Sequence, residues 1–285
     1  MKKKKLLGKL KKLETILSSM QSSKQSTMKS KRRTTIIKWI LVAFVVILIL
    51  MVAGTVLYVN DYYHADMKAM EALQTVSDNI SIEKESFGDV SEALIYMPEN
   101  PVAGIVFYPG AKVQYEAYAP LALALSENDI AVVIVKMPCN LAILNQDAAS
   151  DVIKSYPEID SWYIAGHSLG GAMAADFVAD HDKEYEGIIL LAAYSMKDLS
   201  ELELDVISIY GTEDQVLSAE SYEKYRSNLG KDYQEVVIDG GCHAYFGSYG
   251  PQDGDGTPSI DMESQLEQTS DAIEKFIVDN MNIAE

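Results

Sequence analysis

Trp162-Tyr163-Ile164-Ala165 is a short apolar run, and Gly166-His167-Ser168-Leu169-Gly170 follows it directly. The run predicts a buried strand, and the small and apolar residues from Gly171 to Asp180 predict a helix. A serine between two glycines at such a strand-to-helix turn is the arrangement of a nucleophile elbow. Glycine is needed there because the sharp turn brings the backbone close to its neighbours. We therefore expect an exposed Ser168 hydroxyl above a helix N-terminus, whose amides can stabilise an oxyanion.

The motif alone is weak, because three fixed positions of common residues recur by chance in roughly one chain in ten of this length. Its surroundings therefore matter more. Eight apolar runs have strand character: 80–87, 93–97, 104–108, 130–135, 162–165, 187–192, 206–210 and 234–238. Stretches typical of helices alternate with them, which predicts an α/β domain with a mostly parallel sheet covered on both faces. Eight strands with the elbow after the fifth match the order of the α/β-hydrolase fold.

The charge of the chain is divided sharply along its length. Residues 1–38 contain 13 of the 24 Lys and Arg residues and one acid, Glu14, which leaves 11 basic and 41 acidic side chains for the rest. Residues 39–59 carry no charge and are dominated by Ile, Leu and Val. As a helix they are about 31 Å long, the thickness of the hydrocarbon core of a bilayer. We expect four parts: a basic tail at 1–38, a transmembrane helix at 39–59, a stalk or first helix at 60–79 and a hydrolase domain at 80–285.

Two other interpretations of residues 39–59 are a buried helix of a soluble domain and a cleaved signal peptide. A buried helix rarely lacks a polar stripe over so many residues. A signal peptide has a shorter apolar core and a small-x-small cleavage site, which is not evident here. Basic residues precede the span, and Asp61 and Asp66 follow it. The positive-inside rule therefore predicts an uncleaved signal anchor in the cell membrane, with a cytoplasmic N-terminus and an extracellular domain.

The two charged regions suggest different surroundings. A domain as acidic as the one after the span is a poor candidate for binding nucleic acid, which requires clustered basic residues. In the basic tail, four leucines fall on one helical face among lysines: Leu6, Leu10, Leu13 and Leu17. Such a segment can lie on anionic lipid. A solvated tail that only sets the topology is the equally weighted alternative.

A serine hydroxyl needs a base within hydrogen-bond reach and a carboxylate that orients the base. In this fold the order along the chain is serine, acid, histidine. Of the four histidines, only His243 comes late enough, directly after the last predicted strand, whereas His167 inside the elbow should point away from Ser168. Asp214 follows the penultimate strand and is the expected acid, with Glu213 as the close alternative. The predicted catalytic triad is therefore Ser168, Asp214 and His243.

The oxyanion hole requires two backbone N–H groups. One is that of Leu169, directly after the nucleophile, and the other should come from the loop after the third strand, where Ala111 is the expected donor and Lys112 the alternative.

We expect no metal and no cofactor, because the chain has no H-E-x-x-H motif, no Walker A loop and no G-x-G-x-x-G after a strand. The segment Asp253-Gly254-Asp255-Gly256 lacks the later ligands of a calcium loop and predicts a flexible loop.

Four separated motifs carry a family resemblance. They are Phe107-Tyr108-Pro109-Gly110-Ala111-Lys112-Val113, Val135-Lys136-Met137-Pro138, Gly166-His167-Ser168-Leu169-Gly170-Gly171 and Gly240-Gly241-Cys242-His243-Ala244-Tyr245-Phe246-Gly247. In this order they resemble the bacterial α/β hydrolases related to dienelactone hydrolases, over about residues 80–280. The resemblance implies Ser168, Asp214 and His243 as the triad. The chain departs from the family at Cys242, where a polar residue is expected, and at Cys139, where an aliphatic one is. Dienelactone hydrolases use a cysteine nucleophile, so their substrate is not implied.

Together these features predict a membrane-anchored serine hydrolase that cleaves an ester or related acyl bond of a small substrate through an acyl-enzyme. A thioesterase, an amidase or an acyltransferase would use the same residues. The alternative from another class is an inactive surface binding module with this fold, whose mark would be a missing member of the triad. The membrane contact would be made by residues 39–59.

Two further expectations concern the surroundings of the site. Cys139 and Cys242 each follow a predicted strand, and an oxidising exterior permits a disulfide between them, with two separate thiols as the alternative. Only residues 194–205 separate the sixth strand from the seventh, too few for a cap domain. An open cleft buries little of a long acyl chain, so we expect a preference for short acyl groups. The loop 247–260 is the segment that would cover the site instead.

Overall fold

The computed structural model describes residues 2–75 and 77–283. Parts of the predicted tail, stalk and domain, namely Met1, Val76 and residues 284–285, lie outside the described residues. The chain forms two compact units, Met1–Asn60 and Asp61–Glu285. Each unit is described by itself.

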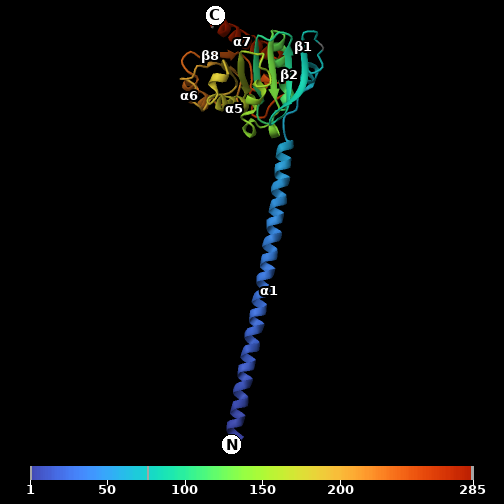
Figure 1. Cartoon of the computed structure of the whole chain (residues 1–285), viewed down its shortest axis with the longest axis vertical. Helices are drawn as coiled ribbons and strands as arrows, with labels where there is room; N and C mark the ends of the chain where they lie inside the picture. The colour runs from blue at the N-terminus through green and yellow to red at the C-terminus, as the bar shows by residue number, and fades with distance from the viewer. Residues whose placement is uncertain (1, 76, 284–285) are drawn as a thin grey trace. The chain divides into compact units, whose positions relative to one another are not determined.

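The first unit is one continuous helix, α1 (Lys2–Asn60) (Figure 1). Its segment Ile36–Asn60 is the one helix in the described part of the chain that is long and apolar enough to cross a membrane. The large apolar side chains of this segment, Trp39 and Leu57 among them, are exposed. A helix pairs its backbone groups internally, so an apolar helix of this length is one of the structures that can lie in lipid. The segment is compatible with a single-pass membrane anchor.

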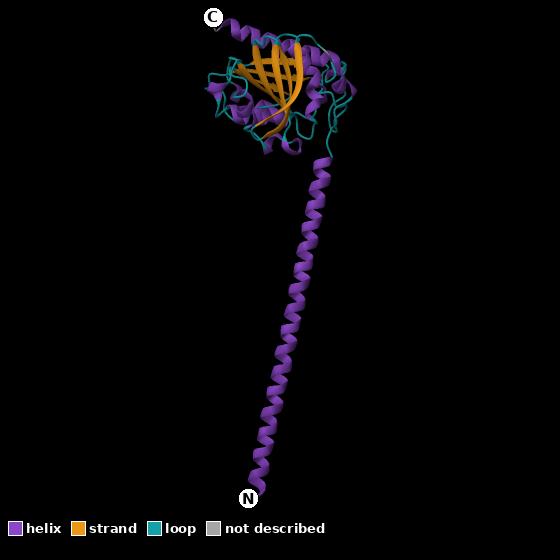
Figure 2. Ribbon diagram, turned by 45° about the vertical axis from the view of Figure 1, so that its right-hand side comes forward, coloured by secondary structure: helices purple, strands orange, loops and turns teal. Residues whose placement is uncertain are grey.

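The second unit is built around one eight-stranded sheet, which Figure 2 shows with helices on both sides. Its strands are β1 (Ile80–Phe87), β2 (Val90–Pro98), β3 (Ala103–Tyr108), β4 (Ile130–Val135), β5 (Trp162–His167), β6 (Gly187–Leu191), β7 (Asp205–Gly211) and β8 (Gln234–Ile238). Their spatial order is β1-β2-β4-β3-β5-β6-β7-β8. β2 pairs antiparallel with β1 and β4, and every later pair is parallel. The predicted α/β-hydrolase strand order is confirmed.

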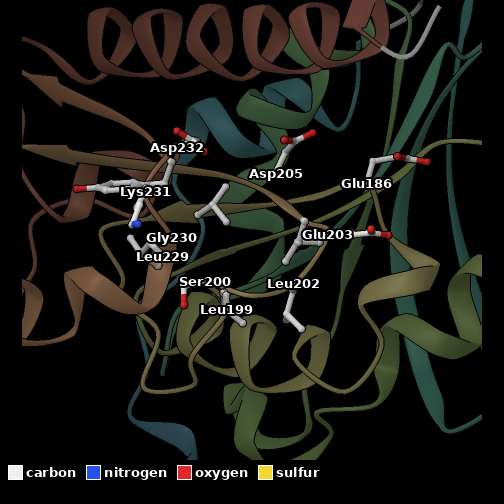
Figure 3. A pocket seen from close by; sticks show the side chains of 13 residues that line it. Glu186, Leu199, Ser200, Leu202, Glu203, Asp205, Leu229, Gly230, Lys231 and Asp232 are labelled. Carbon is white, nitrogen blue, oxygen red and sulfur yellow. The ribbon is translucent and has the colours of Figure 1, made fainter.

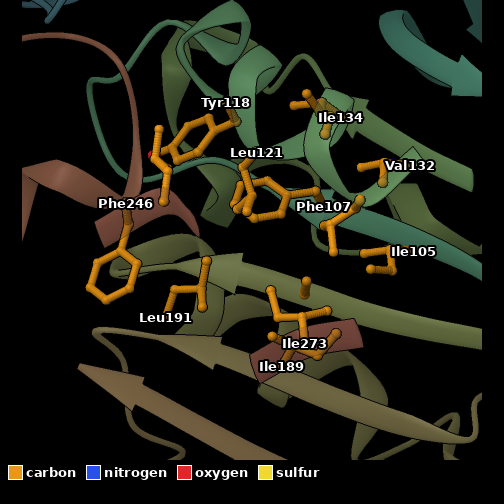
Figure 4. Packing of buried hydrophobic residues seen from close by; sticks show 14 of the residues in the cluster. Ile105, Phe107, Tyr118, Leu121, Val132, Ile134, Ile189, Leu191, Phe246 and Ile273 are labelled. Carbon is orange, nitrogen blue, oxygen red and sulfur yellow. The ribbon is translucent and has the colours of Figure 1, made fainter. Parts of the chain in front are cut away.

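Helices bury both faces of this sheet. The helices of the unit are α2 (Met67–Ala72), α3 (Ala119–Ser126), α4 (Ala148–Ile153), α5 (Leu169–Val178), α6 (Ala219–Tyr225) and α7 (Met262–Ile283). α2, α3 and α7 pack on one face, where Phe107 and Leu121 meet (Figure 4), and α4 and α5 pack on the other. Along β3, Phe107 faces the first core and Val106 the second. Successive side chains of a strand point to opposite faces, which is why continuous apolar runs such as β3 form doubly covered parallel strands.

The segment expected to be a stalk or a first helix packs against this domain. It contains α2, whose Ala69 is fully buried. Before α2, Tyr63 forms an isolated parallel bridge with Val113. The compact unit accordingly begins at Asp61 rather than at residue 80.

The connection between β6 and β7 is short. Its residues 192–204, all of them described, contain no helix and no strand. A cap domain inserted at this point would need several elements of its own. The sheet therefore carries no cap at this position.

Candidate active site

The backbone is strained at the predicted nucleophile, Ser168, which lies in the turn between a strand and a helix. β5 ends and α5 begins on either side of Ser168, whose φ of 54° and ψ of −123° are rarely adopted by residues other than glycine. A Cβ on Gly166 would lie 2.5 Å from the carbonyl carbon of Gly170, and a Cβ on Gly170 would lie 2.1 Å from the carbonyl oxygen of Tyr108. Both positions therefore require glycine. The Ser168 N–H also donates to the Leu191 carbonyl at 2.9 Å, which helps to hold the turn at the carboxyl edge of the sheet.

The predicted base and acid form a buried pair. His243 Nδ1 lies 2.8 Å from Asp214 Oδ2, and the two side chains are 1% and 2% exposed. Asp214 Oδ1 accepts the N–H groups of Val216 and Leu217, each at 2.8 Å. Such a carboxylate also accepts a hydrogen bond from Nδ1–H, so in the neutral ring of His243 the lone pair is on Nε2. The bond to His243 is made by Asp214 and not by Glu213, the alternative acid.

The remaining imidazole nitrogen of the base is available. Within residues 2–75 and 77–283, His243 Nε2 is buried and has no hydrogen-bond partner, so no such bond joins it to Ser168 Oγ in this structure. Its ring centroid lies 4.5 Å from that of His167, the residue directly before Ser168. Catalytic hydrogen bonds are often long in the absence of substrate. A buried acceptor without a partner, next to a nucleophile elbow, is suited to taking a proton.

The loops that carry the acid and the base are joined by main-chain hydrogen bonds. β7 and β8 are parallel neighbours, so their carboxyl ends lie side by side. The N–H of Thr212 donates to the Ile238 carbonyl at 3.0 Å, and the N–H of Glu213 donates to the Gly241 carbonyl at 2.8 Å. These main-chain bonds hold the loop of Asp214 against the loop of His243 without a contribution from either side chain.

Asp255 holds the loop of His243 and was not found by sequence reasoning. Its Oδ2 accepts the N–H of Ala244 at 2.8 Å, and its Oδ1 accepts the N–H of His243 at 3.2 Å and of Gln215 at 3.4 Å. The segment 253–256, expected to be a flexible loop, is instead tied through this carboxylate to the loops that carry Asp214 and His243. An aspartate among glycines is a common turn signal, so its sequence surroundings did not reveal this role.

The hydrogen bonds of the loop after β3 distinguish the two candidate oxyanion donors. The N–H of Lys112 donates to the Asn140 carbonyl at 2.8 Å. In the part of the chain that the structure describes, no hydrogen bond is recorded for the N–H of Ala111 or for that of Leu169. β3 and β5 are parallel neighbours with Tyr108 opposite Gly166, so this loop and the elbow leave the same edge of the sheet. The arrangement favours Ala111 over Lys112 as the second donor.

A second buried histidine, His167, links the loop after β3 to His243. The N–H of Gly110 donates to the Tyr118 hydroxyl, which lies 2.9 Å from His167 Nδ1. Burial, followed by the nearby His243, holds the pKa of His167 well below its usual value, so the ring is neutral and its Nδ1 accepts a hydrogen bond from the Tyr118 hydroxyl. Burial also raises the pKa of Tyr118. Sequence reasoning set His167 aside on the direction of its side chain, and only the structure places its ring against that of His243.

The two cysteines are free thiols in the structure. Cys139 is exposed, whereas Cys242 is buried, and burial raises the pKa of the Cys242 thiol to about 12. A thiol with so high a pKa stays protonated and unreactive near neutral pH.

Over the described ranges, no group of three or more His, Cys, Asp or Glu residues is placed to hold a metal ion.

Two hollows of the domain lie away from these residues. One of about 340 Å³ is lined by residues at the amino ends of β6, β7 and β8, including Glu186, Asp205 and Asp232 (Figure 3). The other, of about 550 Å³, lies between α2, α3 and α7. Neither is lined by Ser168 or His243.

Known proteins resemble this chain in sequence and in fold. Residues 104–267 match the family model of the alpha/beta hydrolase family. No curated protein sequence matches the chain significantly. Est1E from Butyrivibrio proteoclasticus has a similar structure over 72% of this chain and 100% of its own, with a TM-score of 0.53 and 15% identity. XC6422 from Xanthomonas campestris, described as a serine hydrolase without a lid, is similar over 71% of this chain and 95% of its own, with a TM-score of 0.50 and 17% identity. At these identities the structural likeness shows the fold.

Proposed function

Because the chain belongs to the alpha/beta hydrolase family, we propose that it is a membrane-anchored serine hydrolase that cleaves an ester or related acyl bond. The observation that carries this proposal is the buried Asp214–His243 pair, 2.8 Å apart, with the unpartnered Nε2 of His243 beside the elbow of Ser168. A binding module that had lost its activity would have no need to keep a strained serine and a buried acid–base pair together.

In the proposed reaction, Ser168 Oγ attacks the carbonyl carbon of the ester while His243 Nε2 takes the hydroxyl proton. The carbonyl oxygen becomes an oxyanion that the N–H groups of Leu169 and Ala111 stabilise. His243 then gives its proton to the departing alcohol, and an acyl-enzyme remains on Ser168. Water, deprotonated by the same nitrogen, attacks the acyl-enzyme and releases the acid. Asp214 holds the imidazole and stabilises its charged form in both steps.

The neutral state of His167 supports the same scheme. Its ring centroid lies 4.5 Å from that of His243, so a positive charge on His167 would oppose the imidazolium that forms during catalysis. Burial holds the pKa of His167 low and so removes this opposition.

The test of the activity is a comparison of the full chain with Ser168→Ala. The wild-type protein should hydrolyse p-nitrophenyl acetate and be labelled covalently by a fluorophosphonate, and the variant should do neither while keeping its melting temperature. A substitution of exposed Ser155 by alanine is the matched control and should behave as the wild type. Undiminished labelling of Ser168→Ala would reject Ser168 as the nucleophile, and an unlabelled wild-type protein would favour the inactive binding module.

Anchoring in the cell membrane is the second part of the proposal, and the apolar segment Ile36–Asn60 supports it. The basic residues before this segment favour a cytoplasmic N-terminus and an extracellular hydrolase domain. Protease added to intact cells should therefore digest residues 61–285. Protection of the domain until the cells are lysed would reverse the topology.

The short β6–β7 connection supports a preference for short acyl groups. Each CH₂ left exposed forgoes about 0.8 kcal/mol of hydrophobic binding, so an uncapped site gains little from a long chain. We expect a higher kcat/KM for acetyl and butyryl esters than for palmitoyl esters, without interfacial activation. A kcat/KM that climbs steadily with chain length would show that another segment, such as loop 247–260, covers the site.

A further inference from the structure

Residues 61–66, here called the strap, follow the last residue of α1 in the sequence and belong to the compact hydrolase unit. The strap runs along the loop that carries the proposed oxyanion donor. The N–H of Tyr63 donates to the Lys112 carbonyl at 2.7 Å, and the N–H of Gln114 donates to the Tyr63 carbonyl at 2.9 Å. This is the hydrogen-bonding pattern of a short parallel bridge, centred on Val113. The strap therefore holds the chain immediately after Ala111.

Side chains add to this main-chain pairing. Asp61 Oδ2 lies 2.6 Å from Lys112 Nζ, and Gln114 Oε1 accepts the N–H of Ala65 at 3.1 Å. Lys112 has a φ of 57°, in the left-handed region that costs a lysine about 1 kcal/mol or more. Such a conformation persists only where neighbouring contacts hold it. The strap contacts both the carbonyl and the ammonium group of Lys112.

The strap also contacts the loop behind the base. The N–H of Asp66 donates to the Ser248 carbonyl at 2.8 Å, and the N–H of Asp253 donates to the Tyr63 hydroxyl at 3.1 Å. The rings of Tyr63 and Tyr249 pack with centroids 5.6 Å apart. This is the loop whose Asp255 accepts hydrogen bonds from the backbone of the histidine loop. One short segment thus contacts loops on both sides of the elbow.

We propose that the strap is a positioning element of the active site, with Tyr63 as its central positioning residue. It holds Lys112 in its left-handed conformation. As a result, the N–H of the preceding residue, Ala111, makes no hydrogen bond within the loop and can donate to the oxyanion. The inference rests on the proposed hydrolase function. An oxyanion donor acts on the transition state rather than on the bound substrate, so loosening the strap lowers kcat and leaves KM nearly unchanged.

The experiment compares two proline variants of the full chain in detergent micelles. Tyr63→Pro removes the N–H that donates to the Lys112 carbonyl. Asp78→Pro is the control outside the strap, because Asp78 is exposed and no hydrogen bond of its N–H is found in the described ranges. Kinetics with p-nitrophenyl acetate are measured well below the melting temperature of each variant. We expect kcat of Tyr63→Pro to fall about 10- to 100-fold with KM within about threefold of the wild type. Asp78→Pro should keep a kcat near that of the wild type.

A Tyr63→Pro variant with wild-type kcat, or an equal loss of kcat in both proline variants, would overturn the proposal. If Tyr63→Pro does not fold, Asp61→Lys decides the question, because its exposed side chain would then repel Lys112. Its kcat should fall about three- to tenfold at low salt, whereas Asp78→Lys, an exposed control with the same change in charge, should not change kcat. An unchanged kcat in Asp61→Lys overturns the proposal as well. A wild-type protein without ester hydrolysis or fluorophosphonate labelling would instead reject the hydrolase function itself.

Discussion

The two edges of the sheet differ in how much backbone strain they carry and in where a hollow lies. Among the described residues, five of the six non-glycine residues with a positive φ, Ser168 and Ala192 among them, follow the carboxyl ends of strands, whereas the sixth, Asp129, precedes β4. Nε2 of the buried His243 also has no hydrogen-bond partner among the described residues. At the amino edge lies a hollow of about 340 Å³ with a largely polar lining that includes Glu186 and Asp232 (Figure 3). Strain and unsatisfied buried groups are costly, so they persist where a function requires them. The proposed site is therefore assigned from the strained Ser168 and the buried Asp214–His243 pair, because neither hollow is lined by Ser168 or His243.

The largest effect expected at the carboxyl edge is that of the base. His243→Gln keeps a hydrogen-bonding side chain but removes the nitrogen that takes the proton from Ser168. We expect kcat for p-nitrophenyl acetate to fall by about 10³-fold or more. Steady-state kinetics of the purified full chain measure this. A loss smaller than tenfold would mean that the pair with Asp214 is structural and that the base lies elsewhere.

Next in size is the effect of the carboxylate behind the base. Asp255→Ala leaves the N–H groups of His243 and Ala244 without their acceptor, which should cost about 1–3 kcal/mol of unfolding free energy. Misplacement of the imidazole should lower kcat about 10- to 100-fold. Asp253→Ala is the control, because that exposed side chain lies in the same loop. Thermal melts and kinetics of the two variants should differ, and matching values would remove Asp255 from the site.

A smaller effect, on stability, is expected from His167. Its pKa in the folded protein lies below the value near 6.5 of an unfolded chain, because burial disfavours the charged ring. Between the two pKa values the unfolded chain binds a proton that the folded protein does not. The unfolding free energy should therefore decrease as pH falls below about 6.5, by up to about 1.4 kcal/mol per pH unit.

Denaturant melts between pH 7 and pH 5 test this linkage. His167→Gln should flatten the dependence of unfolding free energy on pH, because glutamine has no such titration. His64→Gln changes an exposed histidine of the strap region and should keep the steeper wild-type dependence. Identical slopes in the wild type and His167→Gln would show that other groups cause the acid sensitivity.

The smallest effect is expected at the amino edge. Asp232→Asn changes an exposed residue of the hollow and should leave kcat/KM within about twofold and stability within about 0.5 kcal/mol. Ester kinetics and a thermal melt suffice. A tenfold loss of activity would mean that the hollow takes part in the reaction, and the contrast between the two edges would no longer hold.

Much of the fold was predictable because its signals are local. Apolar runs such as Ile130–Val135 and the glycines around Ser168 report a strand and a sharp turn from neighbouring residues alone. The order along the chain then nominates Asp214 and His243, because each directly follows a strand of a known order. The start of the domain at Asp61 was harder to predict from the sequence. Tyr63 lies in a short polar and aromatic stretch without the period of a strand, and its bridge partner is 50 residues away.

The sequence by itself determined the α/β-hydrolase fold, the long apolar helix before it and the candidates for nucleophile, base and acid. These follow from periodicity, glycine positions and chain order, which neighbouring residues specify. Only the tertiary structure decided that Asp214 rather than Glu213 bonds His243, that the N–H of Lys112 is already engaged and that Asp255 accepts hydrogen bonds from the histidine loop. Hydrogen bonds of this kind join loops that are distant in the sequence. Their partners depend on where the folded sheet brings those loops together, and no local pattern encodes that.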